Sequence, residues 1–387
     1  MARNRILVLA DDLTGALEVG AKFAAAGVDS RVLTLPGLGP LTLQAAEGAL
    51  VVDTETRHAT PAEAARQVFE LARAARDEAY AHLYKKTDST LRGNIGAELA
   101  ALIEAFDGAP VLYVPAYPQM GRTVVNGSLY VDGVPVVSTA FSHDGLNPVR
   151  ESHIPSLLAA QCRFPARLAR VEQIADSSPW SVVVCDGETD ADVETAAQAF
   201  AGSEVFKVAA GPSAFAAHWA RLVNLPRRPC PALPSVRTAL VVNGSRHEAS
   251  LRQVAQAKRD GFHTIGAGSS PGVTADGGWF ILEQAPAAGT SDYAGRLVEA
   301  VCQILARSAI EAVVVFGGDT AYALVEALGH PPLVPLGELM EGIPVAAIEA
   351  KQLSDRIGPR DRDLYLVTKA GGFGPPHVVA SLRGRLV

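Results

Sequence analysis

The sequence predicts an α/β protein with two lobes, each built on a mainly parallel sheet, and a ligand-binding cleft between the lobes. Three observations lead to this prediction. Short apolar runs of strand length recur along the chain, most are followed by a polar or glycine residue and a helical stretch, and a proline-rich segment interrupts the alternation after residue 225. Alternating strands and helices are typical of parallel sheets that have helices on their faces.

Several apolar runs in the amino-terminal part are predicted to be buried strands. They cover residues 5–10, 49–53, 82–86, 110–115, 181–186 and 205–209. A helix is expected over residues 61–80, because Thr60 is a good N-cap and Pro61 suits the first helical turn. Each such strand–helix unit adds to the case for a parallel sheet.

One segment departs from this alternation. The dipeptide Asp132-Gly133 separates two short strand candidates, residues 128–131 and 134–137. Asp-Gly between two apolar runs is a strong signal for a two-residue β-hairpin turn. Pro135 has no backbone N–H to donate, so we expect the second strand to lie at the edge of its sheet.

The segment 226–237 contains prolines at positions 226, 229, 231 and 234. Proline cannot continue a helix or a central strand, so this segment is expected to be an extended linker. It separates an amino-terminal domain, residues 1–225, from a carboxy-terminal domain, residues 238–387. In the second domain we expect strands at 238–243, 312–316 and 364–369 and helices at 246–260 and 321–328. Ligands of open α/β sheets bind beyond the carboxyl ends of the strands, which favours a site in the cleft between the domains.

Composition and charge exclude several classes of protein. The 387 residues include 34 Lys and Arg against 41 Asp and Glu, a net charge of -7, so the basic excess of a nucleic-acid-binding protein is missing. No apolar run reaches the about 18 residues of a membrane span, and no signal peptide is expected. The four cysteines are scattered without a Cys-x-x-Cys motif, which favours a cytoplasmic location over disulfides or a zinc knot.

A pair of carboxylates follows the first predicted strand. Asp11 and Asp12 end that strand, and a helix opens through Thr14 and Gly15. A single Asp at this place would most simply cap the helix. Two adjacent acids exceed what capping requires, and they suit hydrogen bonds from substrate hydroxyls or the positioning of a hydroxyl for attack on phosphorus.

A dense polar segment follows the strand at 82–86. It supplies cations for a carboxylate, and an acid, an amide and hydroxyls for a polyol, through Lys86, Thr87, Asp88, Ser89, Arg92 and Asn94. A solvated polar turn is the simpler alternative, and it fits Lys85 alone. Strand alternation sends Lys85 and Lys86 to opposite faces, and Lys86 is the expected inward cation. Arg57, after the strand at 49–53, adds a further cation.

Two further loops carry polar side chains. The first spans residues 115–126 and contains Arg122, and the second spans 142–152 and contains His143 and Arg150. Loops of this length are often functional, although each of these residues taken alone is more often structural. No spacing of His, Cys, Asp and Glu resembles a dedicated zinc site.

Three glycine-rich strand ends stand out in the carboxy-terminal domain, at residues 243–247, 316–320 and 368–374. Glycine lets backbone N–H groups approach a phosphate closely, and a helix opening at Thr320 adds its own N–H groups. A single Gly-Gly turn would more simply be a tight connection, but three in one domain favour a nucleotide site. Neither a P-loop nor a dinucleotide fingerprint is present. A domain for a hydroxylated anion beside a domain for phosphates implies phosphoryl transfer from a nucleotide to a hydroxyl.

Several motifs together resemble the four-carbon acid sugar kinase family. They are LADDLTGA at 9–16, YKKTDSTLRGN at 84–94, VPAYPQMGRTVVNG at 114–127, HDGLNPVRES at 143–152, NGSRH at 243–247, GGDT at 317–320 and KAGGFG at 369–374. The resemblance covers nearly the whole chain in the same order. It implies that the amino-terminal domain binds a C4 sugar acid such as threonate, erythronate or 3-oxo-tetronate. It also implies that the carboxy-terminal domain binds ATP and that the terminal hydroxyl is phosphorylated.

The resemblance also implies roles for individual residues. The acid sugar would be contacted by Asp11, Arg57 and the segment from Lys86 to Ser89. ATP would be contacted by Ser245, Gly317, Gly318, Asp319, Thr320 and Gly371.

A mechanism follows as a hypothesis from these residues. Arg57, Lys86 and Arg92 are expected to hold the substrate carboxylate. Asp11, Asp12 and Asp88 are the candidate catalytic residues, and Asp11 or Asp12 would orient the hydroxyl and accept its proton late. Mg²⁺ is expected to bridge the ATP phosphates with few protein ligands, Asp319 being one candidate.

Alternatives stay open at this point. The chain could be a kinase for another small hydroxy acid such as glycerate, or a regulator that binds nucleotide and sugar acid without turnover. Its partners are expected to be small molecules, with neither nucleic acid nor membrane, and self-association as a homo-oligomer is left open.

Overall fold

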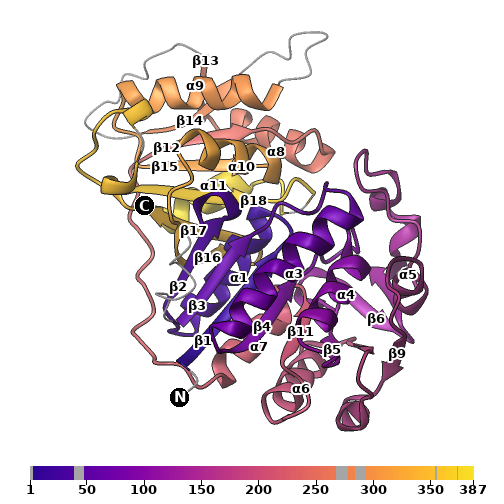
Figure 1. The fold of residues 1–387 in the computed structure, drawn as a ribbon. Coiled ribbons are helices and arrows are strands. Elements are labelled where there is room, and N and C mark those ends of the chain that lie inside the picture. Colours follow the sequence, from indigo (N-terminus) through magenta and orange to yellow (C-terminus); the bar gives the residue numbers. More distant parts are fainter. Residues whose placement is uncertain (1–2, 39–47, 267–277, 284–292, 354, 373) are drawn as a thin grey trace. The chain divides into compact units, whose positions relative to one another are not determined.

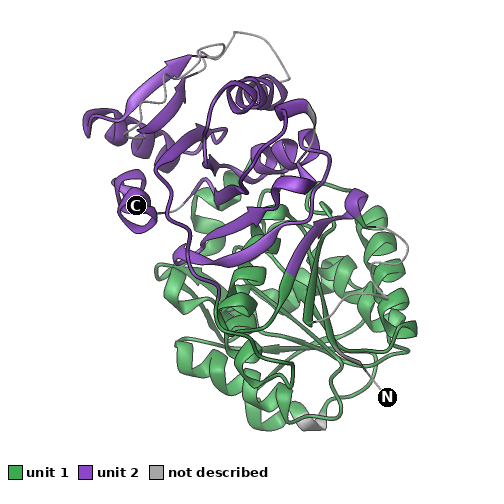
Figure 2. Ribbon diagram, turned by 90° about the vertical axis from the view of Figure 1, so that its left-hand side faces the viewer, with its two compact units in different colours: residues 1–30, 38–230 green, residues 31–37, 231–387 purple. Residues whose placement is uncertain are grey.

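The computed structural model describes residues 3–38, 48–266, 278–283, 293–353, 355–372 and 374–387 (Figure 1). By its internal contacts the chain forms two compact units (Figure 2). Unit 1 comprises residues 1–30 and 38–230, and unit 2 comprises residues 31–37 and 231–387. The division after residue 230 falls inside the proline-rich segment, and residues 31–37 group with unit 2 although unit 1 surrounds them in the sequence.

An eight-stranded sheet has the order β2-β3-β1-β4-β11-β5-β10-β9. Its strands are β1 (Arg3–Ala10), β2 (Ser30–Thr34), β3 (Gly48–Asp53), β4 (Tyr80–Lys86), β5 (Val111–Tyr113), β9 (Ala166–Ala169), β10 (Val182–Cys185) and β11 (Val208–Gly211). β1 pairs in parallel with β3 and β4, and β11 pairs in parallel with β4 and β5. The carboxyl ends of β3, β1 and β4 therefore meet at one edge of the sheet.

The helices of unit 1 alternate with these strands. They are α1 (Leu13–Ala25), α3 (Pro61–Asp77), α4 (Ile95–Ala105), α5 (Ile154–Gln161), α6 (Asp190–Ala201) and α7 (Ser213–Leu222). The predicted start of α3 is confirmed, because Thr60 caps it and forms a capping box with Glu63. The predicted end at residue 80 is wrong: Ala79 has a φ of 57°, which ends the helical path before Tyr80 opens β4. The strand predicted from residue 205 begins only at Val208, and Val205 is exposed.

The predicted hairpin is present in a small antiparallel sheet of order β6-β7-β8. Its strands are β6 (Arg122–Val125), β7 (Ser128–Val131) and β8 (Val134–Pro135). Asp132 and Gly133 have φ angles of 50° and 79°, the positive pair that a type I′ turn requires. β8 is the edge strand, as Pro135 predicts, but it ends at this proline. Residues 136–138 form a short 3₁₀ turn and not the rest of the predicted strand.

Unit 2 contains a seven-stranded sheet of order β13-β14-β12-β15-β18-β17-β16. Its strands are β12 (Thr238–Asn243), β13 (His263–Gly266), β14 (Gly278–Glu283), β15 (Ala312–Phe316), β16 (Val334–Met340), β17 (Ile343–Ile348) and β18 (Leu364–Lys369), and its helices are α8 (Glu248–Arg259), α9 (Tyr293–Arg307), α10 (Gly318–Ala327) and α11 (Val378–Leu386). The three strands predicted here are confirmed. β12, β14, β15 and β18 run parallel, whereas β17 pairs antiparallel with both β18 and β16.

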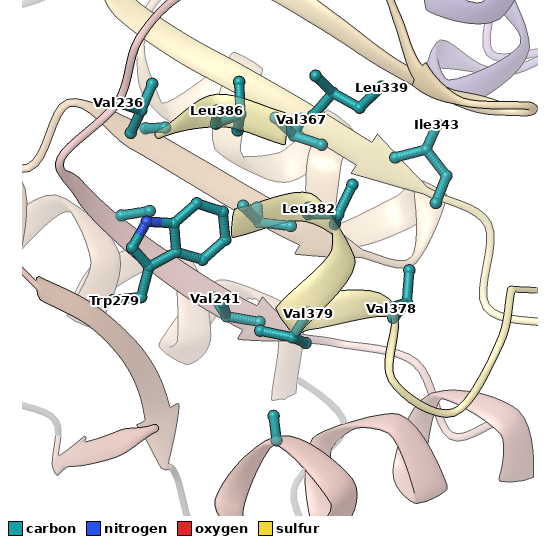
Figure 3. Close-up of a cluster of buried hydrophobic side chains, with 14 of the residues drawn as sticks. Val236, Val241, Trp279, Leu339, Ile343, Val367, Val378, Val379, Leu382 and Leu386 are labelled. Atoms are coloured by element: carbon teal, nitrogen blue, oxygen red, sulfur yellow. The ribbon is translucent and has the colours of Figure 1, made fainter. Parts of the chain in front are cut away.

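One hydrophobic core of unit 2 lies between its sheet and helix α11 (Figure 3). Val379, Leu382 and Leu386 of α11 are buried there together with Val241 of β12 and Trp279 of β14. These side chains recur along α11 at helical spacing, so one face of the helix covers the sheet. The loops that follow β12, β15 and β18 contribute no side chain to this core. Within the described ranges, no helix has the length and apolar character needed to cross a bilayer.

Candidate functional site

The sheet order of unit 1 brings three polar segments together. β1 lies between β3 and β4, and its last residue, Ala10, pairs with Asp53 on one side and with Lys86 on the other. The chain therefore leaves all three strands at the same level. The acids after β1, the segment ending at Arg57 after β3, and the polar run after β4 all start from this edge.

Arg57 is the centre of this cluster. Its Nε donates to Asp11 Oδ2 at 2.8 Å and its Nη2 donates to Asp11 Oδ1 at 2.9 Å, a bidentate pair. Its Nη1 donates to Asp12 Oδ2 at 2.7 Å, and Nη2 lies 3.7 Å from Asp88 Oδ1. Burial acts to raise the pKa of Asp11, but the charges of Arg57 and of two lysines outweigh it and the pKa is lowered. All three candidate catalytic acids thus surround one buried guanidinium.

Asp12 also begins helix α1. Its Oδ1 accepts a hydrogen bond from the backbone N–H of Gly15 at 3.0 Å, so the capping role and a place in the cluster are both realised. A Cβ atom on Gly15 would lie 2.6 Å from Asp12 Oδ1 and 2.9 Å from Lys86 Nζ. Glycine is therefore what allows the carboxylate and the ammonium to approach the start of the helix. The hydroxyl of Thr14, in the same turn, is buried with no hydrogen-bond partner among the described residues.

Asp88 is held by Arg92 in a second bidentate pair. Arg92 Nη2 donates to Asp88 Oδ1 at 2.8 Å and Nε donates to Oδ2 at 3.0 Å. Burial opposes ionisation of Asp88, but the charges of Arg92 and Arg57 hold its pKa well below the usual range. The Arg92 Nη1 donates to Asp144 Oδ2 at 3.2 Å. Asp144 comes from the loop in which the sequence singled out His143, so the sequence pointed to the right loop and missed the residue that reaches the cluster.

Both arginines are thus occupied by carboxylates of the protein. Arg57 and Arg92 were expected to bind the substrate carboxylate, and residue types alone did not reveal their pairing within the chain. The two cations neutralise and orient the acids of the cluster. A cavity of about 330 Å³ adjoins it, lined among others by Arg92, Gly93 and Arg150.

The two lysines at the end of β4 each have a glutamate partner from a helix. Lys85 is fully buried, and its Nζ lies 3.1 Å from Oε2 of Glu98 on α4. Lys86 Nζ lies 3.9 Å from Oε2 of Glu18 on α1 and donates to the Thr87 carbonyl at 2.9 Å. Lys85 is therefore not the solvated turn residue that the simpler reading allowed. Glu98 is an acid within the apolar run of α4, which could have indicated a buried ion pair, but it was not selected from the sequence.

The remaining predicted residues of this segment have smaller parts in the cluster. Asn94 donates through Nδ2 to the carbonyls of Thr56 and Ala59, at 2.9 Å each, so its amide holds the loop after β3. Thr87 is buried and Ser89 is half-buried. Asn94 thus stabilises the backbone of the loop after β3, a structural role that its residue type did not reveal.

Two more acids, Asp53 and Glu55, stand beside the cluster. Burial, joined by the nearby charge of Asp12, raises the pKa of Asp53 to about 8. Burial and the charge of Asp53 raise the pKa of Glu55 to about 9. Burial therefore opposes ionisation of both side chains, and nearby carboxylate charges make it less favourable still.

In unit 2 the glycine-rich strand ends lie against one another. β12, β15 and β18 are neighbours in the sheet, and each is followed by one of the predicted loops. A Cβ atom on Gly244 would lie 1.8 Å from Thr320 Oγ1, and one on Gly371 would lie 2.1 Å from Ser245 Oγ. Gly317, at a φ of 114°, donates its N–H to the Lys369 carbonyl at 2.9 Å. Gly318 and Asp319 form the first turn of α10 beside them. The predicted nucleotide residues are thus gathered at one edge of the sheet.

Lys369 is a residue of this edge that the sequence analysis did not single out. Its buried Nζ donates to the carbonyl of Ala370 at 2.8 Å and to Ser250 Oγ at 3.3 Å. It also lies 4.5 Å from the centre of the Phe316 ring. Burial lowers the pKa of Lys369 to about 7. The side chain ties the glycine loop after β18 to helix α8 and to the end of β15.

The chain thus combines two α/β units, each with polar or glycine residues gathered at one edge of its sheet. The family model described as a sugar-binding N-terminal domain matches residues 6–219, and the model described as a nucleotide-binding C-terminal domain matches residues 281–379. The chain is 32% identical to a D-threonate kinase of Bordetella bronchiseptica, over 96% of this chain and 95% of that protein. It is 26% identical to a 3-oxo-tetronate kinase of Methylobacterium radiotolerans, over 95% of both chains. The chain belongs to the four-carbon acid sugar kinase family and is a phosphotransferase acting on an alcohol group.

Solved structures agree with the fold. A protein of Salmonella typhimurium has a TM-score of 0.79 at 21% identity, over 98% of both chains. A Bordetella bronchiseptica protein, a domain-swapped dimer with bound citrate, has a TM-score of 0.51 at 30% identity and covers 98% of both chains. The predicted α/β class with mainly parallel sheets is confirmed.

Proposed function

We propose that the chain transfers the γ-phosphate of ATP to the terminal hydroxyl of a four-carbon sugar acid, with D-threonate as the preferred acid. The observation that carries this proposal is the convergence of Asp11, Asp12 and Asp88 on Arg57 at one sheet edge of unit 1. The choice of D-threonate is supported by the similarity to a D-threonate kinase along nearly the full length of both chains.

In this proposal the acids of unit 1 have different tasks. Asp11 has both carboxylate oxygens bound by Arg57, and its side chain is 2% exposed, whereas the side chain of Asp12 is 15% exposed. Asp12 therefore orients the terminal hydroxyl and accepts its proton late, because an alcohol is too weak an acid to ionise before attack. Asp11 holds Arg57 in place, and Asp88 holds Arg92 in place. Lys86, Thr87 and Ser89 complete the acid-sugar site, while Arg92 orients Asp88 and Asn94 holds the loop after β3.

Unit 2 binds the nucleotide in this proposal. Backbone N–H groups at Gly318 and Gly371 and the first turn of α10 face phosphate oxygens, and Ser245 and Thr320 offer hydroxyls. Gly317, whose N–H donates to the Lys369 carbonyl, lets the backbone approach the phosphates closely. The described residues hold no ready-made group of three or more metal ligands. Mg²⁺ is commonly held by substrate phosphates and one or two carboxylates, and in this proposal Asp319 is one of them. When bound, Mg²⁺ would neutralise charge on the phosphates.

The test is a substrate screen with the purified protein. ADP release is measured with ATP, Mg²⁺ and each of D-threonate, L-threonate, D-erythronate and 3-oxo-tetronate, with glycerate as a shorter acid. We expect the highest kcat/KM with D-threonate, and phosphorus NMR of the product should show an ester at the terminal carbon. Faster turnover of glycerate would replace the proposal by a kinase for another hydroxy acid. Acid binding without any acid-dependent ADP release would make the protein a regulator.

The proposal includes a cytoplasmic location and self-association. All four cysteines are unpaired, which suits a reducing compartment. The domain-swapped dimer of the Bordetella bronchiseptica protein supports a homo-oligomer, and light scattering of the purified chain would test it.

A further inference from the structure

Arg122 is a buried arginine at the start of β6, on the loop that leaves β5. Its backbone is tied to Tyr117, since Tyr117 N–H donates to the Arg122 carbonyl at 2.7 Å and Arg122 N–H donates back at 3.0 Å. The Tyr117 hydroxyl donates to Glu18 Oε1 at 3.0 Å, and the other oxygen of Glu18 lies 3.9 Å from Lys86 Nζ. The main chain and one hydroxyl thus connect Arg122 to the acid-sugar cluster of unit 1.

The partners of Arg122 differ from those of the other two arginines. Arg57 and Arg92 each contact two carboxylates within hydrogen-bond distance. Arg122 is 9% exposed and donates through Nη1 to the carbonyl of Met120. Its Nε has no hydrogen-bond partner in the described part of the chain. Across the described residues, no carboxylate oxygen lies within 4.0 Å of its guanidinium nitrogens. Arg122 is thus a buried cation without an anionic contact.

Such a group is unfavourable in the free protein. Removing a guanidinium from water is costly unless an anion and hydrogen-bond acceptors replace the water. Burial accordingly lowers the pKa of Arg122, and the more distant charges of Asp132, Asp88 and Glu18 offset this only in part. The loop of Arg122 is tied to Glu18 of helix α1 through the Tyr117 hydroxyl.

We propose that Arg122 binds the carboxylate of the sugar acid. This inference rests on the proposed function and deepens it. Arg57 and Arg92 already carry carboxylates of the protein, so a substrate carboxylate placed on them would have to displace Asp11, Asp12, Asp88 or Asp144. On Arg122 it meets a cation with a free Nε–H, and a guanidinium can bind both oxygens of a carboxylate at once. Arg122 thereby determines which end of the short acid faces Asp12.

The test compares the acid with its neutral amide in wild-type protein and in the Arg122→Met and Arg122→Lys variants. The amide of the preferred acid keeps every hydroxyl and lacks the negative charge. Wild-type protein should favour the acid over the amide in kcat/KM, and Arg122→Met should lose about tenfold to a hundredfold in kcat/KM for the acid. The same variant should leave kcat/KM for the amide and KM for ATP nearly unchanged. Arg122→Lys should restore part of the preference for the acid over the amide, because lysine keeps the positive charge but lacks the bidentate guanidinium.

A matched control is Arg66→Met, on the exposed face of α3, which should change none of these values. Added guanidinium ion should recover part of the activity of Arg122→Met toward the acid. If Arg122→Met lowers kcat/KM equally for acid and amide and guanidinium does not rescue it, Arg122 only supports the loop, and the inference fails. If wild-type protein phosphorylates no four-carbon acid, the proposed function fails instead, and the two failures are distinguished by this first measurement.

Discussion

Arg57 holds Asp11 through two parallel hydrogen bonds, from Nε to Oδ2 at 2.8 Å and from Nη2 to Oδ1 at 2.9 Å. The two residues are 46 positions apart and follow different strands. They meet because β1 and β3 are adjacent and parallel, so that both chains turn out of the sheet at the same edge. The pair organises the cluster by fixing the guanidinium that also reaches Asp12.

Replacing Arg57 by methionine should destabilise the protein strongly. The substitution removes the guanidinium that holds buried Asp11 and half-buried Asp12, and breaking a buried pair from one side costs about 3–5 kcal/mol. Urea unfolding of unit 1, followed by the fluorescence of its buried Trp219, would measure the change. The control is Arg66→Met, whose partner Glu70 is exposed on α3, and which should change the free energy of unfolding by less than about 1 kcal/mol. Equal effects of the two substitutions would contradict the central role of Arg57.

Asp12→Asn and Asp11→Asn should separate catalysis from stability. Asp12→Asn removes the proton acceptor and should lower kcat by about 10²–10⁴-fold, with only a modest change in unfolding free energy. Asp11→Asn breaks the bidentate pair with Arg57 and should lower stability more than Asp12→Asn does. Steady-state kinetics and urea unfolding of both variants provide the measurement. Near-normal turnover by Asp12→Asn would remove this residue from the proposed mechanism.

The Asp53 and Glu55 pair should make stability depend on pH in a defined direction. Their pKa values are raised from 3.8 and 4.5 to about 8 and about 9. At a pH between the unfolded and the folded pKa values, the folded state therefore keeps protons that the unfolded state has released. Stability from this pair therefore falls as the pH rises from about 4 toward 9. The double variant Asp53→Asn/Glu55→Gln cannot ionise at these positions. Its unfolding free energy should decline less than that of wild-type protein between pH 6 and pH 9.

Other titrating groups do not affect the difference in pH dependence between wild type and the double variant. Lys369, with its pKa lowered to about 7, acts in the opposite direction, because above that pH the unfolded state binds more protons than the folded state. It is present in both proteins, so its contribution cancels in the difference. Parallel curves for wild type and the double variant would show that Asp53 and Glu55 are not protonated in the folded protein.

Gly371→Ala should impair nucleotide binding selectively. The new Cβ would lie 2.1 Å from Ser245 Oγ and 3.0 Å from Ser245 Cβ, so the loop after β12 or the loop after β18 must move. We expect KM for ATP to rise at least tenfold while binding of the sugar acid to unit 1, measured by calorimetry without nucleotide, stays unchanged. Gly384→Ala on α11 is the matched control, because its Cβ would meet no atom within 4 Å. A normal KM for ATP in Gly371→Ala would argue against this edge as the phosphate site.

Short apolar runs located some strands of unit 2 and not others. β12, β15 and β18 were located at their observed bounds, since each contains the apolar run expected of a strand covered on both faces. β17 is buried along its whole length and was still missed. Strand β16 alternates buried and half-buried residues, and its pairing with β17 is antiparallel, so the search for parallel strands missed it. The late start of β11 and the early end of α3 depend on local backbone geometry that residue type alone does not set.

The candidate site shows the same division. Asp11, Arg57 and Asp88 were found because polar residues at strand ends are conspicuous. Glu18 and Glu98 were not found, because they lie within helices and their role depends on the lysines of β4 that they contact in the folded chain.

The sequence by itself determined which chemical groups stand at the strand ends: acids, arginines and lysines in unit 1 and glycines in unit 2. Only the tertiary structure decided how these charges are paired. Coulomb attraction and desolvation depend on distance and burial, and these are set by strand order and helix packing between residues far apart in the chain. That pairing engages Arg57 and Arg92 with carboxylates of the protein and leaves Arg122 as the buried cation to which we assign the substrate carboxylate.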